Sequence, residues 1–138
     1  MGTLSVAQEK FYQKFCMKKT YQTGIYGEQL ASRWLENHEK MRLLENRFRT
    51  KAGEIDLIMT DGETIVFIEV KTRMNTAPGT GLLAVDKKKQ QRIARAAYLF
   101  LSQKRWLHRS VRFDIVEVSA DKILHIKNAF QPGSMFFG

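Results

Sequence analysis

The chain has 138 residues, 43% of them hydrophobic and 27% charged, which is typical of one soluble globular domain. No apolar run approaches the roughly 18 residues of a membrane-spanning helix and no secretory pattern opens the chain, which predicts a cytoplasmic protein without a membrane partner. A single cysteine, Cys16, excludes an intrachain disulfide and a cysteine-cluster zinc site, and the net charge of +9 favours a polyanionic partner.

The expected elements alternate between helix and strand along the chain. Residues 1–20 are polar and weakly patterned, so they are interpreted as a disordered N-terminal extension, and 21–138 as a single domain. That domain is expected to contain, in order, a helix over 23–38, a strand over 41–46, two strands around Asp61 and Gly62, a loop over 75–81, a helix over 86–104, and two strands around a turn at 119–121. This order predicts an α/β fold with a mixed sheet between helices.

The two strands around Asp61 and Gly62 place charged residues among apolar ones. If these two residues form the turn, Leu57 faces Val66, and residues two apart along each strand share a face. One face is then almost wholly apolar and is expected against the core helices; it carries Ile55, Leu57, Met59, Thr64, Val66, Ile68 and Val70. The opposite face carries Ile58, Ile65 and Phe67 near the turn and, remote from it, Glu54, Asp56, Glu69 and Lys71.

The charged end of that second face is a candidate metal site. In the predicted register Asp56 and Glu69 are diagonal neighbours with Cα atoms about 7–8 Å apart, and Glu54 lies directly opposite Glu69. Like charges this close are unfavourable without a cation, and carboxylate oxygens suit Mg²⁺. Lys71 supplies one positive charge, so a salt-bridged hairpin surface without a metal remains the alternative. The apolar residues on the same face favour a site, because partly buried like charges are costly unless they are paired.

The positive charge of the chain is concentrated in one segment. Residues 87–112 contain nine basic residues and no acid, whereas 14 basic and 14 acidic residues balance each other elsewhere. Three lysines, Lys87 to Lys89, occupy the first turn of the expected helix, where cations oppose the helix dipole. A phosphate-bearing partner explains this cluster, which predicts nucleic-acid binding; a solvated helix face is the alternative.

Asp56 and, after twelve intervening residues, Glu69-Val70-Lys71 match the D…(D/E)-x-K signature of restriction-endonuclease-like nucleases. The segments YGEQLASRWL, GEIDLIM, VFIEVKTR, AVDKKKQQRI, VRFDIVEV and IKNAF follow in this order, and together they resemble the YraN-like family of small bacterial proteins. The resemblance covers about residues 21–130. It implies a restriction-endonuclease-like core of three layers, with helices flanking a mixed β-sheet, and a metal-dependent phosphodiesterase site.

The resemblance also implies a role for each site residue. The catalytic set is Glu28, Asp56, Glu69 and Lys71. Asp56, Glu69 and the backbone carbonyl of Val70 would ligate Mg²⁺ or Mn²⁺, and Glu28 would join them through water or complete a second metal site. Lys71, expected to stay protonated beside the acids, would orient the attacking water or stabilise developing charge. Glu54 is either a support for these ligands or an exposed charge of the hairpin.

Contacts with nucleic acid are expected from the segments that follow the site, at Arg73, Lys87, Lys88, Lys89, Arg92 and Arg95. The sequence thus predicts a Mg- or Mn-dependent endodeoxyribonuclease. DNA is favoured over RNA, and branched or structured DNA is included because the implied fold resembles that of archaeal Holliday-junction resolvases; such an enzyme would act as a homodimer. Two alternatives remain, a non-catalytic nucleic-acid-binding or adaptor module and a purely structural hairpin.

Three further residues are assigned structural or open roles. Trp34 lies on the apolar stripe of the first helix and is expected in the core. Asp114 is interpreted as a buried anchor for Arg112, with a position beside the site as the alternative. Trp106, at the end of the basic helix, is expected either to pack or to stack on a ligand.

Overall fold

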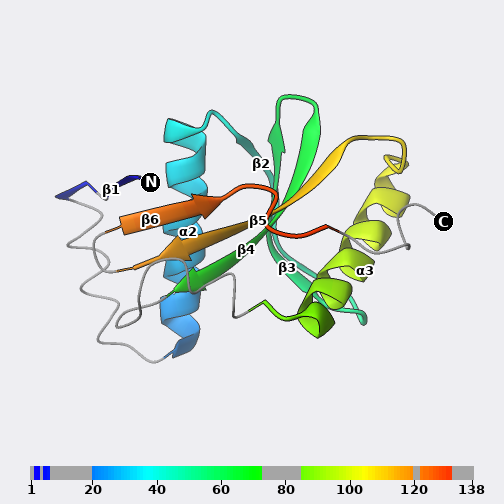
Figure 1. The fold of residues 1–138 in the computed structure, drawn as a ribbon, viewed down its shortest axis with the longest axis horizontal. Helices are drawn as coiled ribbons and strands as arrows, with labels where there is room; N and C mark the ends of the chain where they lie inside the picture. Colours follow the sequence, from blue (N-terminus) through cyan, green and yellow to red (C-terminus); the bar gives the residue numbers. More distant parts are fainter. Residues whose placement is uncertain (1, 4, 7–19, 73–84, 120–121, 132–138) are drawn as a thin grey trace.

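The structure, a computed structural model, describes residues 2–3, 5–6, 20–72, 85–119 and 122–131, which form a mixed sheet with helices packed on it (Figure 1). The elements are β1 (Gly2–Thr3), α2 (Thr20–His38), β2 (Arg42–Arg49), β3 (Glu54–Asp61), β4 (Thr64–Thr72), α3 (Lys87–Lys104), β5 (Val111–Val118) and β6 (Lys122–Ile126). The expected α/β order is confirmed. Asp86 caps α3, because its side chain accepts a hydrogen bond from Lys89 N at 2.8 Å. Within the described ranges, no helix has the length and apolar character needed to cross a bilayer.

The sheet has the strand order β1-β6-β5-β4-β3-β2. Neighbouring strands are antiparallel except β4 and β5, which are parallel because the chain returns through α3 between them. β1 pairs with β6, so the first residues of the predicted N-terminal extension contribute to the sheet. Most of that extension, residues 7–19, lies outside the described residues.

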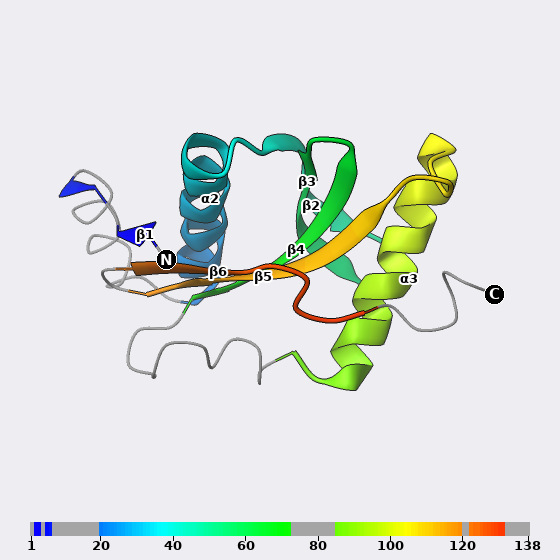
Figure 2. The same ribbon diagram turned by 45° about the horizontal axis from the view of Figure 1, so that its top comes forward.

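Helices α2 and α3 lie on opposite sides of the sheet (Figure 2). An apolar core lies under each helix. The core on the α2 side includes Leu30, Trp34, Leu35, Leu57, Met59, Val66, Ile68, Val116 and Val118. The core on the α3 side includes Ile58, Ile65, Phe67, Ile93, Ala97, Phe100, Phe113 and Ile115. The protein therefore has the three layers expected from the sequence and is compatible with a restriction-endonuclease-like core. Trp34 is 4% exposed, which confirms its place in the core.

The hairpin between β3 and β4 turns one residue later than predicted. Asp61 pairs with Thr64, which leaves Gly62 and Glu63 as the turn residues. Gly62 has a φ of 60° and precedes Glu63, the arrangement of a type II′ turn, in which glycine takes the first central position. The pairing shifts by two residues, an even number, so the side chains keep their predicted faces. Ile55 is the exception, because it joins the core on the α3 side instead of the α2 side.

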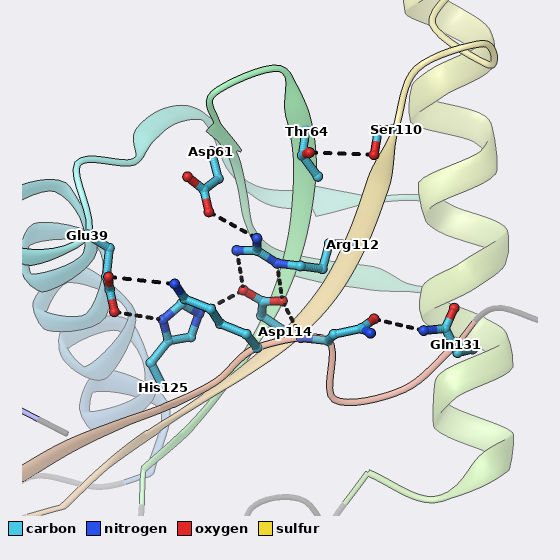
Figure 3. Close-up of polar contacts among 10 residues, drawn as sticks. Glu39, Asp61, Thr64, Ser110, Arg112, Asp114, His125 and Gln131 are labelled. Atoms are coloured by element: carbon cyan, nitrogen blue, oxygen red, sulfur yellow. Dashed lines mark hydrogen bonds and ion pairs between the residues drawn. The ribbon is translucent and has the colours of Figure 1, made fainter.

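A buried polar network joins β5 and β6 at the α2 side of the sheet (Figure 3). Asp114, which is 0% exposed, accepts two hydrogen bonds of 2.9 Å from the Arg112 guanidinium and one of 2.9 Å from Asn128 N, and its Oδ2 lies 2.7 Å from His125 Nε2. Burial acts to raise the pKa of Asp114, but these hydrogen bonds outweigh it and lower the pKa. The prediction that Asp114 anchors Arg112 is confirmed.

Candidate functional site

The site begins where the sheet forks between β3 and β4. Their pairing ends at Leu57 and Ile68, yet β3 continues beside β2 as far as Glu54 and β4 continues beside β5 to its end. At the fork, Val70 N donates a hydrogen bond of 2.8 Å to Asp56 Oδ2. The Asp56 carboxylate thus occupies the place of a main-chain acceptor, which holds it beside β4. The fork also explains why the alternation of faces breaks at the start of β3.

Two glycines bring the helices close to this fork. A Cβ on Gly27 of α2 would overlap with Thr72 Oγ1 at the end of β4, and a Cβ on Gly53 would lie 2.9 Å from the carbonyl oxygen of Arg92 on α3. Without these side chains, α2 and α3 approach the fork from opposite faces of the sheet. The cavity between them has a volume of about 430 Å³ and is lined by Gly24, Ile25, Glu28, Arg47, Gly53, Glu54, Asp56, Glu69, Lys89, Arg92 and Ile93.

Burial raises the pKa of two acids in this cavity, and the neighbouring acids add to the rise. Burial raises the pKa of Glu28 from 4.5 to about 7, with the Arg47 guanidinium opposing and the neighbouring acids adding to the rise. Burial and the charge of Glu69 raise the pKa of Asp56 from 3.8 to about 8, against the hydrogen bond from Val70 N. Burial, with the neighbouring acids adding to it, therefore disfavours the charged forms of Glu28 and Asp56.

Two lysines, one from β4 and one from α3, meet Glu69, which is 7% exposed. Lys89 Nζ lies 2.9 Å from Glu69 Oε1, and Lys71 Nζ lies 3.6 Å from the same oxygen. Burial acts to lower the pKa of Lys89, but Lys71 and the acids raise it above its usual value. Burial and Lys89 lower the pKa of Lys71. That Lys71 stays protonated beside the acids remains a prediction; Lys89 occupies the closer position against Glu69.

Arg47 is a cavity residue that the sequence did not reveal. It lies in β2 with a φ of 52°, which is uncommon for a residue with a side chain. Its guanidinium nitrogens lie 3.8 Å from Glu28 Oε1 and 3.8 Å from Glu54 Oε1. In the sequence Arg47 belongs to a strand with no apolar alternation and resembles an ordinary surface residue. The contact of Arg49 Nε with Glu54, at 3.5 Å, shows that Glu54 pairs with arginines at the rim of the cavity.

The structure brings together most of the predicted site. Glu28, Asp56 and Glu69 line one cavity, and Lys71 contacts Glu69. Of the residues assigned to nucleic acid, Lys89 and Arg92 line the same cavity, while Lys87, Lys88 and Arg95 are exposed along α3. Arg73 lies outside the described residues.

The donor chemistry of the cavity fits a divalent cation. Asp56 and Glu69 adjoin at the fork, Glu28 faces them from α2, and their carboxylate oxygens are the ligands that Mg²⁺ and Mn²⁺ accept. A cation there would favour the charged carboxylates against the burial and the repulsion that raise the pKa values of Glu28 and Asp56. In the described part of the chain, no three His, Cys, Asp or Glu side chains are already grouped closely enough to hold a metal. The Lys89 ammonium instead neutralises Glu69.

Comparison with known proteins identifies relatives over most of the chain. A model of the "Uncharacterised protein family UPF0102" matches residues 27–118, a range that contains every predicted site residue. A "UPF0102 protein" of Geobacter metallireducens is 43% identical over 112 residues, which cover 78% of this chain and 91% of that protein. Similar proteins of Syntrophus aciditrophicus (42% over 121 residues, 85% and 94%) and Stutzerimonas stutzeri (42% over 120 residues, 83% and 99%) carry the same name.

Proposed function

The chain belongs to the uncharacterised protein family UPF0102, the YraN-like family that its sequence resembles, and we propose that it binds nucleic acid and hydrolyses phosphodiester bonds with Mg²⁺ or Mn²⁺. The observation that carries this proposal is the fork between β3 and β4. It gathers Asp56, Glu69, Lys71 and, from α2, Glu28 at one cavity. The first turns of the basic helix α3 border the same cavity through Lys89 and Arg92.

The residues of the cavity divide the chemistry of phosphodiester cleavage between them. Asp56 and Glu69, with the Val70 carbonyl and Glu28, would hold the cation, which supplies an activated water and neutralises the phosphate. Lys71 lies beside Glu69 and would orient the attacking water or stabilise the developing charge. Lys89 and Arg92 line the cavity and would bind the phosphate and stabilise the charge that develops on it.

A non-catalytic nucleic-acid-binding or adaptor module is the second candidate function. One observation favours it: Lys89 Nζ already neutralises Glu69 at 2.9 Å, so internal cations satisfy part of the acidic cluster. In that case the cluster would shape a phosphate-binding surface without cleaving the substrate. The two candidates differ in their dependence on divalent cations.

A cleavage assay distinguishes the two candidates. The purified protein should nick plasmid or branched DNA in Mg²⁺ or Mn²⁺ and not in chelator, and Asp56→Ala or Glu69→Ala should abolish nicking while DNA binding remains. Glu36→Ala is the matched control, because Glu36 is an exposed acid of α2 outside this cavity. Binding without cleavage on all substrates in both cations would establish the adaptor. Unchanged cleavage in Asp56→Ala would refute the proposed site.

The substrate and the assembly state extend the proposal. DNA is the expected substrate, including branched DNA, and a homodimer acting in the cytoplasm is the expected form. A panel of linear duplex, four-way junction and RNA substrates tests the first expectation, and sedimentation equilibrium with and without DNA tests the second. Preference for RNA would redirect the proposal without affecting the roles of the cavity residues.

A further inference from the structure

Helix α3 ends in a Schellman motif in which arginine occupies the usual position of glycine. Trp106 N donates to Leu101 O at 2.8 Å and Arg105 N donates to Ser102 O at 3.2 Å, the two hydrogen bonds of that motif. The ring of Trp106 packs against Phe100, with the centroids 6.0 Å apart, which supplies the usual hydrophobic contact. Arg105 itself has a φ of 62° and a ψ of 39°, a left-handed conformation that glycine adopts at lower cost. The hydrogen bonds and the hydrophobic contact of the motif are complete, so they do not explain why a residue with a side chain occupies this left-handed position.

Arg105 lines a second, basic hollow in the surface, at the opposite end of α3 from the cavity. Its volume is about 600 Å³, and it is lined by Glu63, Lys104, Arg105, Trp106, His108, Arg109 and Ser110. Arg109 is held in place, because its Nη2 donates to Glu63 O at 3.2 Å and its guanidinium lies 4.8 Å from the centre of the Trp106 ring. Trp106 thus packs against the helix on one side and supports a cation on the other. Three cations face one acid in this hollow.

We propose that this hollow is a second binding site for the phosphate backbone of a nucleic acid. The site rests on the proposed function only in taking nucleic acid as the ligand. α3 has 18 residues, so at 1.5 Å per residue its two ends are about 27 Å apart, which corresponds to roughly 8 base pairs. Arg92 and Arg95 are exposed and add positive charge between the two ends of α3. A polyanion with a regularly repeated charge can contact the basic residues at both ends of α3, whereas a local acidic patch on a protein would contact those at one end.

Charge removal at Arg105 tests the site without unfolding the protein. Arg105→Gly relieves the left-handed backbone, so its Tm should equal or exceed that of the wild type, by up to about 4 °C. Its Kd for a 20-base-pair duplex, measured by fluorescence anisotropy in chelator, should rise about three- to tenfold at 0.15 M salt, and the slope of log Kd against log salt should fall by about one. Lys104→Gln in addition should lower the slope by about one more, and Arg105→Lys should restore most of the affinity.

Lys40→Gly is the matched control. Lys40 is also exposed and left-handed, with a φ of 58°, and follows α2 on the other face of the sheet. Its replacement removes the same charge and the same strain, and should leave Kd within about twofold of the wild type. If Arg105→Gly changes Kd and the salt slope no more than Lys40→Gly does, the second site is refuted, whether or not the protein cleaves DNA. If the protein cleaves nothing but Arg105→Gly weakens binding selectively, the cleavage proposal fails and the second site stands.

Discussion

Replacing Asp56 with asparagine should stabilise the cation-free protein at neutral pH. Asparagine has the shape of aspartate and keeps an oxygen that can accept the hydrogen bond from Val70 N, which aspartate accepts at 2.8 Å. It removes the carboxyl group whose pKa burial and Glu69 raise to about 8. Aspartate at this position is therefore a candidate metal ligand, whereas asparagine there would make the cation-free protein more stable.

The magnitude follows from proton linkage. Because the pKa of Asp56 is raised on folding, from 3.8 to about 8, the folded state binds more protons than the unfolded state in this window, and stability falls as pH rises through it. Each pH unit above the unfolded pKa costs about 1.4 kcal/mol, which gives about 4 kcal/mol at pH 7. The buried amide group of asparagine costs about 1–3 kcal/mol in return. Asp56→Asn should therefore gain about 1–3 kcal/mol at pH 7 and lose about as much at pH 4.

Urea unfolding in chelator at pH 4 and pH 7, followed by circular dichroism, measures both free energies. Lower stability of Asp56→Asn at both pH values would refute the reasoning, because it would show that the carboxyl group is not destabilised by its surroundings. Added Mn²⁺ at ten times its Kd should stabilise the wild type by about 1.4 kcal/mol and leave the variant unchanged. Glu36→Gln, at an exposed acid outside the cavity, is the matched control for the removal of one carboxyl group.

Two further substitutions test the packing of α2 and the buried network. Gly27→Ala should lower the free energy of unfolding by about 1–3 kcal/mol, because the new methyl group overlaps with Thr72 Oγ1. Adding Thr72→Ala in the same chain should restore most of the lost stability. If the second substitution does not rescue the first, the close contact between these two positions is contradicted. Asp114→Ala should cost about 3–5 kcal/mol at pH 7, because Arg112 and His125 lose their buried partner. Since the pKa of Asp114 is lowered on folding, the stability that it contributes is present above pH 3.8 and is lost as pH falls further through the folded-state pKa. The difference in free energy of unfolding between wild type and variant, measured with urea, should therefore shrink at pH 3. A difference that does not depend on pH would contradict this account.

The fold was predictable from local patterns. Alternation in the hairpin assigned Leu57, Met59, Val66 and Ile68 to one core, and the structure confirms this because a strand buried on both faces still alternates between two cores. The register was not predictable, because the sequence DG suits a turn at Asp61 and Gly62, whereas the chain uses Gly62 in the first position of a type II′ turn. Because the pairing shifted by an even number of residues, the predicted faces of these four residues remained correct.

The gathering of acids was predictable, but their neutralisation was not. Asp56, Glu69 and Lys71 lie within one hairpin, so spacing along two strands was sufficient to bring them together. Lys89 and Arg47 reach the cavity from elements whose packing depends on the whole fold, and no local pattern marked either as a partner of these acids. That Lys71 and Lys89 both contact Glu69 was not predictable for the same reason, since it depends on where the Lys89 ammonium lies.

The hydrogen bond from Val70 N to Asp56 Oδ2 places one main-chain amide against the carboxylate that the chemistry would use. In a regular ladder that amide would report only the pairing of strands. Here its proton chemical shift and its exchange with deuterium follow the charge of a single side chain. Loss of a proton from Asp56, arrival of a cation and displacement of that cation would each change one signal in a nitrogen–proton correlation spectrum. The fork thus provides the protein with a spectroscopic indicator of its own site, which can be read before any substrate is known.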